Sequence, residues 1–160
     1  MRRFILLGLV VAVAACGGAD PQPRRAPTGF AETQNPECYT VDLFTDIRFK
    51  RPVAEVPEAW RAFAGRWGAG AWDGAWCHDL YVLEVMPDGL VRLVETHAPY
   101  EPWGKRATAY RRTARIGEDG RMRLRYGQVQ VEYWVEDGKL YGVRREAGQR
   151  QNILLTRESA

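Results

Sequence analysis

The feature that most constrains this chain is a period-two alternation of apolar and polar residues, which runs from about residue 71 to the C-terminus. Turns that join an acidic residue to glycine, such as Asp88-Gly89 and Asp137-Gly138, separate the alternating segments. This combination is typical of β-hairpins. Eight strands are predicted, at residues 71–76, 79–86, 90–97, 106–116, 121–126, 128–135, 139–146 and 152–158.

Eight strands that follow one another through short turns predict an all-β fold, an antiparallel up-and-down meander that closes into a barrel. A short helical turn over 58–64 precedes the strands, so the barrel domain is expected to span 58–160. Arg121, Arg123 and Arg125 alternate along one strand. They leave no apolar outer band of the kind that a membrane barrel needs, so a soluble barrel is expected.

The N-terminus has the pattern of an export signal. Arg2 and Arg3 precede an apolar run over 4–15, which is too short to span a bilayer as a helix. The run ends in Val13-Ala14-Ala15-Cys16, which resembles the lipobox of bacterial lipoproteins. The alternative is ordinary cleavage after the small residues 12–14, which would release a free secreted protein.

The lipoprotein resemblance implies a signal peptide over 1–15 and acyl chains on Cys16, which would anchor the protein to a membrane. Residues 16–29 are then a flexible tether, because they are rich in proline and glycine and poor in apolar bulk. Gly17 stands where an aspartate retains many such lipoproteins on the inner membrane. The resemblance therefore implies the outer membrane of a bacterial envelope, facing the periplasm.

With Cys16 lipidated, Cys38 and Cys77 remain as a pair in an oxidising compartment. We predict a disulfide between them, which would hold the irregular lead-in segment 30–57 against the domain. It would close a loop of about forty residues and add roughly 4 kcal/mol of stability in the chain-entropy model. The alternative is two unrelated buried thiols.

The start of the barrel resembles that of lipocalins and their calycin relatives. A helical turn followed by Gly65-Arg66-Trp67 is similar to the G-x-W motif at the start of their eight-stranded meander. In that family a late arginine packs across the tryptophan at the closed end of the barrel. Arg157 stands where that partner would be, so the resemblance implies a cation–π contact between Arg157 and Trp67.

Charge and motifs exclude several function classes. Without Arg2 and Arg3, 21 basic residues face 20 acidic ones, which is no basis for a nucleic-acid partner. The chain contains no nucleotide-binding, hydrolase or zinc-binding motif, so no catalytic residue, metal or cofactor is predicted. Cys77 and His78 are neighbours on a strand and point to opposite faces, so they do not form a nucleophile–base pair.

Two pairs of polar residues remain as candidates. His97 shares a strand face with Glu95, and without a third ligand or a nucleophile we interpret this pair as solvated at a strand end. Glu84 is expected to point inward, with Arg92 of the next strand as its partner. The pair is either a structural ion pair, which we favour, or the polar anchor of a ligand.

Tyr100 and Trp103 lie in a proline-flanked loop at one mouth of the expected barrel. Their rings either plug the core or contact a ligand. The sequence thus predicts a non-enzymatic, lipid-anchored envelope protein. We expect it to hold a small apolar or amphipathic ligand, with Glu84, Arg92, Tyr100 and Trp103 as contacts. The alternatives are a protein-binding or inhibitory module, on the general plan of small lipid-anchored barrels that inhibit lysozyme, and a structural accessory of an envelope assembly.

Overall fold

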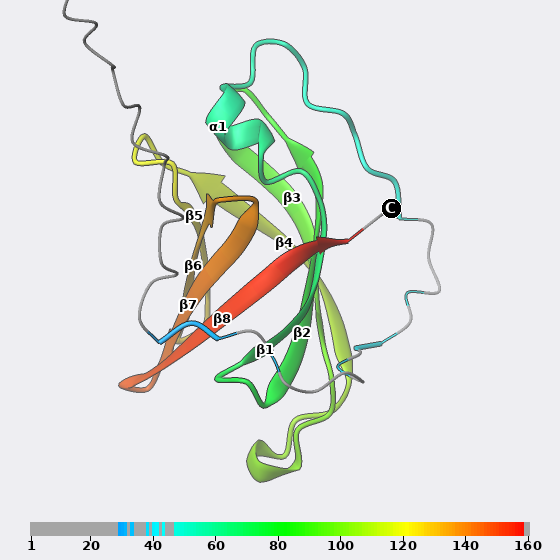
Figure 1. Ribbon diagram of the computed structural model, residues 1–160, viewed down its shortest axis with the longest axis vertical. Coiled ribbons are helices and arrows are strands. Elements are labelled where there is room, and N and C mark those ends of the chain that lie inside the picture. Colours follow the sequence, from blue (N-terminus) through cyan, green and yellow to red (C-terminus); the bar gives the residue numbers. More distant parts are fainter. Residues whose placement is uncertain are drawn as a thin grey trace, which may run out of the picture.

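The computed structural model describes residues 29–31, 33, 38, 40–41, 43 and 47–158. Eight strands form a closed antiparallel barrel in which each strand pairs with the next and the last pairs with the first. The strands are β1 Gly65–Trp72, β2 Trp76–Val85, β3 Leu90–His97, β4 Thr108–Ile116, β5 Met122–Tyr126, β6 Val129–Glu136, β7 Lys139–Glu146 and β8 Gln149–Glu158. The predicted up-and-down barrel is confirmed (Figure 1).

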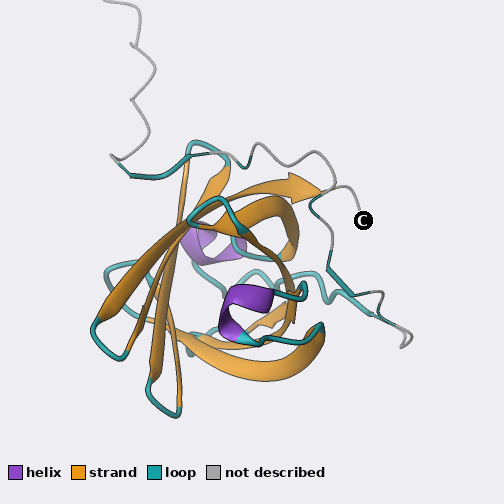
Figure 2. Cartoon of the chain, turned by 90° about the horizontal axis from the view of Figure 1, so that it is seen from below, coloured by secondary structure: helices purple, strands orange, loops and turns teal. Residues whose placement is uncertain are grey.

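Two short helices lie at opposite ends of the barrel. Helix α1 (Glu58–Arg61) is at the top of Figure 1, and the loop with the 3-10 helix η1 (Glu101–Trp103) is at the bottom. From below, the strands run around a single ring (Figure 2). Within the described residues, no helix is both long enough and apolar enough to cross a membrane.

The first strand differs from the prediction. The glycine-rich stretch expected to lead into the barrel is itself strand β1, and the segment expected to be the first strand contains the β1–β2 turn. Asp73 and Gly74 have φ angles of 50° and 75°, which suit a tight hairpin turn. A bulge between Trp67 and Gly70 interrupts the pairing with β2. Gly70 is required where β1 meets β8, because a Cβ there would overlap the carbonyl oxygen of Leu154.

The end of the barrel near α1 has an apolar core, which includes Val56, Phe63 and Trp67. The guanidinium Cζ of Arg157 lies 4.2 Å from the centre of a Trp67 ring. This is the contact that the lipocalin resemblance implies. Arg157 also donates 2.6 Å hydrogen bonds to the carbonyl oxygens of Ala62 and Ala64, and so joins β8 to the segment after α1.

Two described residues of the lead-in segment, Cys38 and Thr40, are bound to β2 and β3. The predicted disulfide between Cys38 and Cys77 is confirmed. Two residues after Cys38, the Thr40 hydroxyl lies 3.2 Å from a carboxylate oxygen of Asp79 and 2.6 Å from the Thr96 hydroxyl. The predicted signal peptide 1–15, the lipidated Cys16 and the tether up to residue 28 lie outside the described residues.

Candidate functional site

A pocket of about 490 Å³ opens at the end of the barrel opposite α1. Its volume is within the usual range for small-molecule sites, roughly 300–1,000 Å³. Its lining residues come from strands β2 to β7 and from the loop after β3. The lining residues are Trp76, His97, Gly104, Lys105, Arg106, Thr108, Tyr110, Arg112, Tyr126, Val129, Arg144 and Glu146.

The polar side chains of the pocket continue the inward faces of strands whose other ends are apolar. On β3, the buried Val91 and Leu93 are followed at the same alternation by Glu95 and His97. Leu93 lies opposite Arg112 of β4, and Glu95 lies opposite Tyr110. The interior of the barrel therefore changes from apolar to polar along its axis, and the polar part faces the mouth near η1.

Two arginines bring positive charge into this polar part. Arg112 Nε donates a hydrogen bond of 3.2 Å to Glu95 Oε2, and its Cζ lies 3.7 Å from the centre of the Tyr126 ring. Arg144 Nη1 donates a 2.8 Å hydrogen bond to Gln151, and Nη2 pairs with Glu146. Lys105 and Arg106 add positive charge at the pocket lining.

Two buried atoms of this cluster are incompletely satisfied. Within the described residues, Nε of Arg144 and Oε1 of Glu95 have no hydrogen-bond partner. Arg144 is 5% exposed and Glu95 is 1% exposed. A buried polar atom without a partner costs about 1–3 kcal/mol, so this end of the barrel is not optimised for stability alone.

Behind the pocket lies a buried hydrogen-bonded chain. Nδ1 of His78 is 3.0 Å from the carbonyl oxygen of Thr96 and 3.3 Å from Nδ1 of His97. Nε2 of His78 is 2.9 Å from the hydroxyl of Tyr133. Because a carbonyl oxygen only accepts, His78 carries its proton on Nδ1, and Nε2 accepts from the tyrosine.

Burial keeps the hydrogen-bonded side chains of His78, His97 and Tyr133 uncharged. It lowers the pKa of His97 to about 3, with the nearby Arg144 as a further cause, and it lowers the pKa of His78 well below its usual value. Burial also raises the pKa of Tyr133, and the charge of Glu95 raises it further. Both imidazoles and the phenol are therefore neutral at neutral pH.

Glu95 differs from these groups because its charge changes near neutral pH. Burial raises the pKa of its carboxyl group to about 6, although Arg112 acts in the opposite direction. The sequence-based interpretation of Glu95 and His97 as a solvated pair is wrong, since both are buried. Their alternation with Val91 and Leu93 is the signal that could have placed them inside the barrel.

The predicted partnership of Glu84 and Arg92 exists, but the expectation that Glu84 points inward is wrong. Glu84 Oε2 is 3.3 Å from Arg92 Nη1, and its Oε1 is 2.9 Å from Lys50 Nζ. A bulge between Val82 and Glu84 shifts the register of β2, so the side chain reaches the outer wall. Arg92 points outward because β3 turns its neighbours Val91 and Leu93 into the core.

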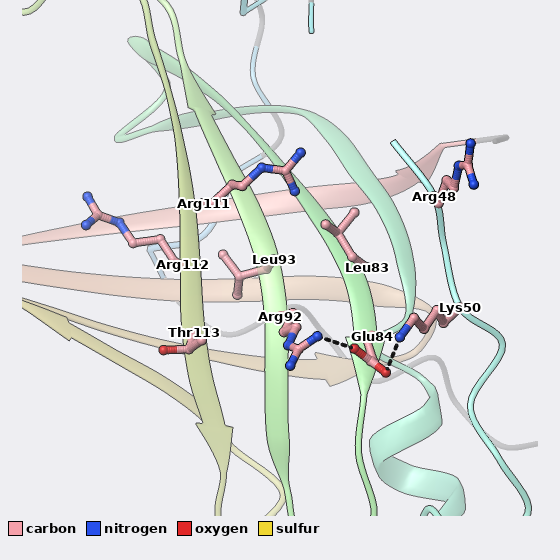
Figure 3. Close-up of a pocket in the computed structure, with 9 residues that line it drawn as sticks. All are labelled: Arg48, Lys50, Leu83, Glu84, Arg92, Leu93, Arg111, Arg112 and Thr113. Carbon is pink, nitrogen blue, oxygen red and sulfur yellow. Dashed lines mark hydrogen bonds and ion pairs between the residues drawn. The ribbon is translucent and has the colours of Figure 1, made fainter. Parts of the chain in front are cut away.

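Glu84 and Arg92 belong to an outer groove of about 450 Å³ between β2–β4 and the lead-in segment, and Arg112 lines both this groove and the inner pocket. Figure 3 shows Glu84 between Lys50 and Arg92, with Arg111 and Arg112 on opposite sides of β4. The nine lining residues are Arg48, Lys50, Leu83, Glu84, Arg92, Leu93, Arg111, Arg112 and Thr113.

Tyr100 and Trp103 are not among the lining residues of the inner pocket, but both pack against Trp76, which lines it. Their ring centres are 6.3 Å and 5.7 Å from that of Trp76, and 5.2 Å from each other. Trp103 remains 39% exposed. The structure therefore separates the four residues predicted to contact a ligand into two pairs, one at the inner pocket and one on the outer wall.

Sequence reasoning missed Arg112 and Arg144 as pocket residues. Arg112 alternates with Ala114 and Ile116, and Arg144 alternates with Leu140 and Gly142, so the period-two pattern placed both on inward faces. Among the described residues, no group of three or more histidine, cysteine or acidic side chains could hold a metal ion. Comparisons with protein-family models, with curated proteins and with solved structures found no match to this chain.

Proposed function

We propose that the protein binds a small organic anion with an apolar or aromatic body in the inner pocket of its barrel. The observation that carries this proposal is the position of Arg112 and Arg144 beside Tyr126 and Trp76. The two guanidinium groups can hold a carboxylate, sulfonate or phosphate group, while the rings contact the body of the ligand.

The incomplete pairing of Arg144 supports the same proposal. Its Nε is buried and has no hydrogen-bond partner among the described residues, and Arg144 is one of the residues that line the pocket. An anion that accepts this hydrogen bond would remove the cost of the unpaired donor. We propose further that acyl chains on Cys16 hold this binding domain at a bacterial membrane, where amphipathic acids are encountered.

The test uses the purified full chain and two fluorescent probes of similar shape. Anilinonaphthalene sulfonate is an aromatic anion, and N-phenylnaphthylamine is its uncharged counterpart. The sulfonate is expected to bind more tightly than the amine. The variant Arg112→Gln is expected to raise the Kd of the sulfonate by about tenfold to a hundredfold, because a hydrogen bond to a charged group is worth about 1.5–3 kcal/mol.

The matched control is Arg111→Gln. Arg111 is the neighbour of Arg112 on β4 and faces the outer groove. The substitution Arg111→Gln therefore removes the same charge from the opposite face of the barrel wall. Unchanged sulfonate binding by Arg112→Gln, or a larger loss with Arg111→Gln, would contradict the proposal. Native mass spectrometry of the protein purified without detergent then asks whether a small acid co-purifies.

A further inference from the structure

We infer that the inner pocket takes up its organic acid as the anion together with one proton, which Glu95 receives. The site then loads under mildly acidic conditions and releases its ligand as the medium becomes neutral to alkaline. The inference rests on the proposed function, and it adds a defined ligand class, singly charged organic acids, and a means of regulating the site.

The first step is the competition for Arg112. In the structure, Glu95 Oε2 accepts a 3.2 Å hydrogen bond from Arg112 Nε, and the same guanidinium lines the pocket. An anion that enters the pocket needs the charge that Glu95 already neutralises. Glu95 is 1% exposed, so water cannot compensate for the repulsion between its carboxylate and the ligand.

The second step is the charge balance around Glu95. The ionisable groups that interact with it come from four other strands: Arg112 of β4, Tyr126 of β5, Tyr133 of β6 and Arg144 of β7. His97 shares its face of β3, and His78 of β2 is hydrogen-bonded to Tyr133. Arg144 also pairs with Glu146. Arg112 and Arg144 thus already face Glu95 and Glu146, whereas Lys105 and Arg106 are exposed to water at the pocket lining. A ligand anion bound between the two arginines therefore adds a negative charge beside the buried carboxylate of Glu95 unless a proton enters.

The third step identifies the side chain that can receive the proton, from the pKa values of the groups around the pocket. His97 has a pKa of about 3, and the pKa of His78 is well below its usual value. Burial raises the pKa of Tyr126 to about 12 and raises that of Tyr133 as well, so both phenols stay neutral. Glu95, with a pKa of about 6, is the member of this group that titrates between about pH 5 and pH 8.

The sign of the effect follows from linkage. A second negative charge beside Glu95 raises the pKa of its carboxyl group in the complex above its value in the empty pocket. Because coupling is reciprocal, the proton on Glu95 strengthens anion binding by the same factor that the anion strengthens proton binding. Affinity is therefore constant below about pH 6 and falls by about tenfold per pH unit above it, until the complex itself loses the proton.

The experiment measures the Kd of anilinonaphthalene sulfonate for the full chain from about pH 5 to pH 8, a range in which the sulfonate keeps its charge. We expect the Kd of the wild-type protein to rise by about tenfold or more across this range. Glu95→Gln, which is permanently uncharged, should bind with a Kd that stays within about twofold of the wild-type value at pH 5. Glu84→Gln is the matched control, because it removes a carboxylate from the outer wall and should keep the wild-type profile.

A wild-type Kd that changes by less than about twofold across the range would overturn the inference, as would a Glu95→Gln profile that still follows pH. Calorimetry on the wild-type protein provides a readout that does not depend on the variant's folding. In two buffers of different ionisation enthalpy at about pH 7, close to one proton should be taken up per sulfonate bound, and no uptake would overturn the inference.

The failure of this inference is distinguishable from that of the proposed function. If binding is independent of pH but is weakened by Arg112→Gln, the pocket binds anions without a proton, and only the inference fails. If Arg112→Gln leaves binding unchanged at every pH, the sulfonate does not use the pocket, and both fail.

Discussion

His78 and Tyr133 meet inside the barrel, with 2.9 Å between the imidazole Nε2 and the phenol oxygen, although 55 residues separate them in the chain. The two rings lie nearly parallel, at an interplanar angle of 3°. His78 is on β2 and Tyr133 is on β6, so the contact crosses the interior rather than following one sheet edge. It connects the buried histidine pair to the tyrosine, whose hydroxyl donates to Nε2 because the Thr96 carbonyl oxygen holds the His78 proton on Nδ1.

Tyr133→Phe should therefore lower the free energy of unfolding by about 1–3 kcal/mol, because it leaves Nε2 of His78 buried without a donor. Tyr110→Phe is the matched control, since Tyr110 is 45% exposed and its hydroxyl can be replaced by water. Denaturant unfolding of both variants measures the difference. Equal effects of the two substitutions would show that the buried hydrogen bond contributes nothing to stability.

The neutral histidines predict acid sensitivity. A histidine with a lowered folded-state pKa contributes stability above its unfolded value of about 6.5, and this contribution is lost as the pH falls toward the folded value. For His97 the folded value is about 3, so the loss is about 1.4 kcal/mol per pH unit below pH 6.5. Glu95 acts in the opposite direction, because its raised pKa adds stability that is lost as the pH rises through about 6.

The measurement is the free energy of unfolding of the wild-type protein and of His97→Asn from about pH 7 to pH 5. The wild-type protein should lose stability as the pH falls, because two buried histidines outweigh one buried glutamate. His97→Asn should show a slope that is smaller by about 1.4 kcal/mol per pH unit. Parallel curves for the two proteins would mean that the pKa of His97 is the same in the folded and unfolded states, which would contradict the prediction.

The disulfide predicts dependence on redox conditions. Cys38 and Cys77 are 39 residues apart, so breaking their bond should lower the free energy of unfolding by about 4 kcal/mol in the chain-entropy model. The comparison is between the wild-type protein and the double variant Cys38→Ser/Cys77→Ser, each with and without reductant. Reductant should destabilise only the wild-type protein, and an equal response in both would contradict the prediction.

Gly70 is predicted to be intolerant of any side chain. An added Cβ would overlap the main chain at Leu154, and a methyl group of Leu155 is 2.5 Å away, so Gly70→Ala must force β1 and β8 apart. We expect a loss of about 2–3 kcal/mol. Gly74→Ala is the control, because nothing lies within 4 Å of its Cβ position and only the strain of a φ of 75° remains, about 1 kcal/mol. Thermal unfolding ranks the two variants, and an equal loss in both would contradict the packing argument.

Much of the barrel follows from alternation and turn chemistry. The strands at 90–97 and 139–146 have the same bounds in the sequence prediction and in the structure, because acidic-Gly turns border them. The first strand was displaced in the prediction, since glycine is usually read as a strand breaker. In the barrel, Gly70 is a strand residue whose lack of a side chain lets β8 approach.

The candidate site was predicted less well than the fold, and Glu84 and Glu95 show why. Alternation states which residues of a strand share a face, but it does not state which face is inside when both carry apolar residues. On β3, Val91 and Val94 lie on opposite faces and both are buried, so both faces carry apolar residues in the sequence. On β2, a single bulge moves Glu84 to the outer wall.

The sequence by itself determined the all-β class, the number and order of the strands, and the cysteine pair, because these depend on local alternation, turn residues and composition. Only the tertiary structure decided that Glu95, Arg112 and Arg144 share one buried pocket, and that Glu84 and Arg92 do not. Which residues share the pocket depends on barrel closure and on strand register. Both bring together residues that are far apart in the sequence, so no single segment predicts them. The interior charge of this protein is therefore a property of the closed barrel.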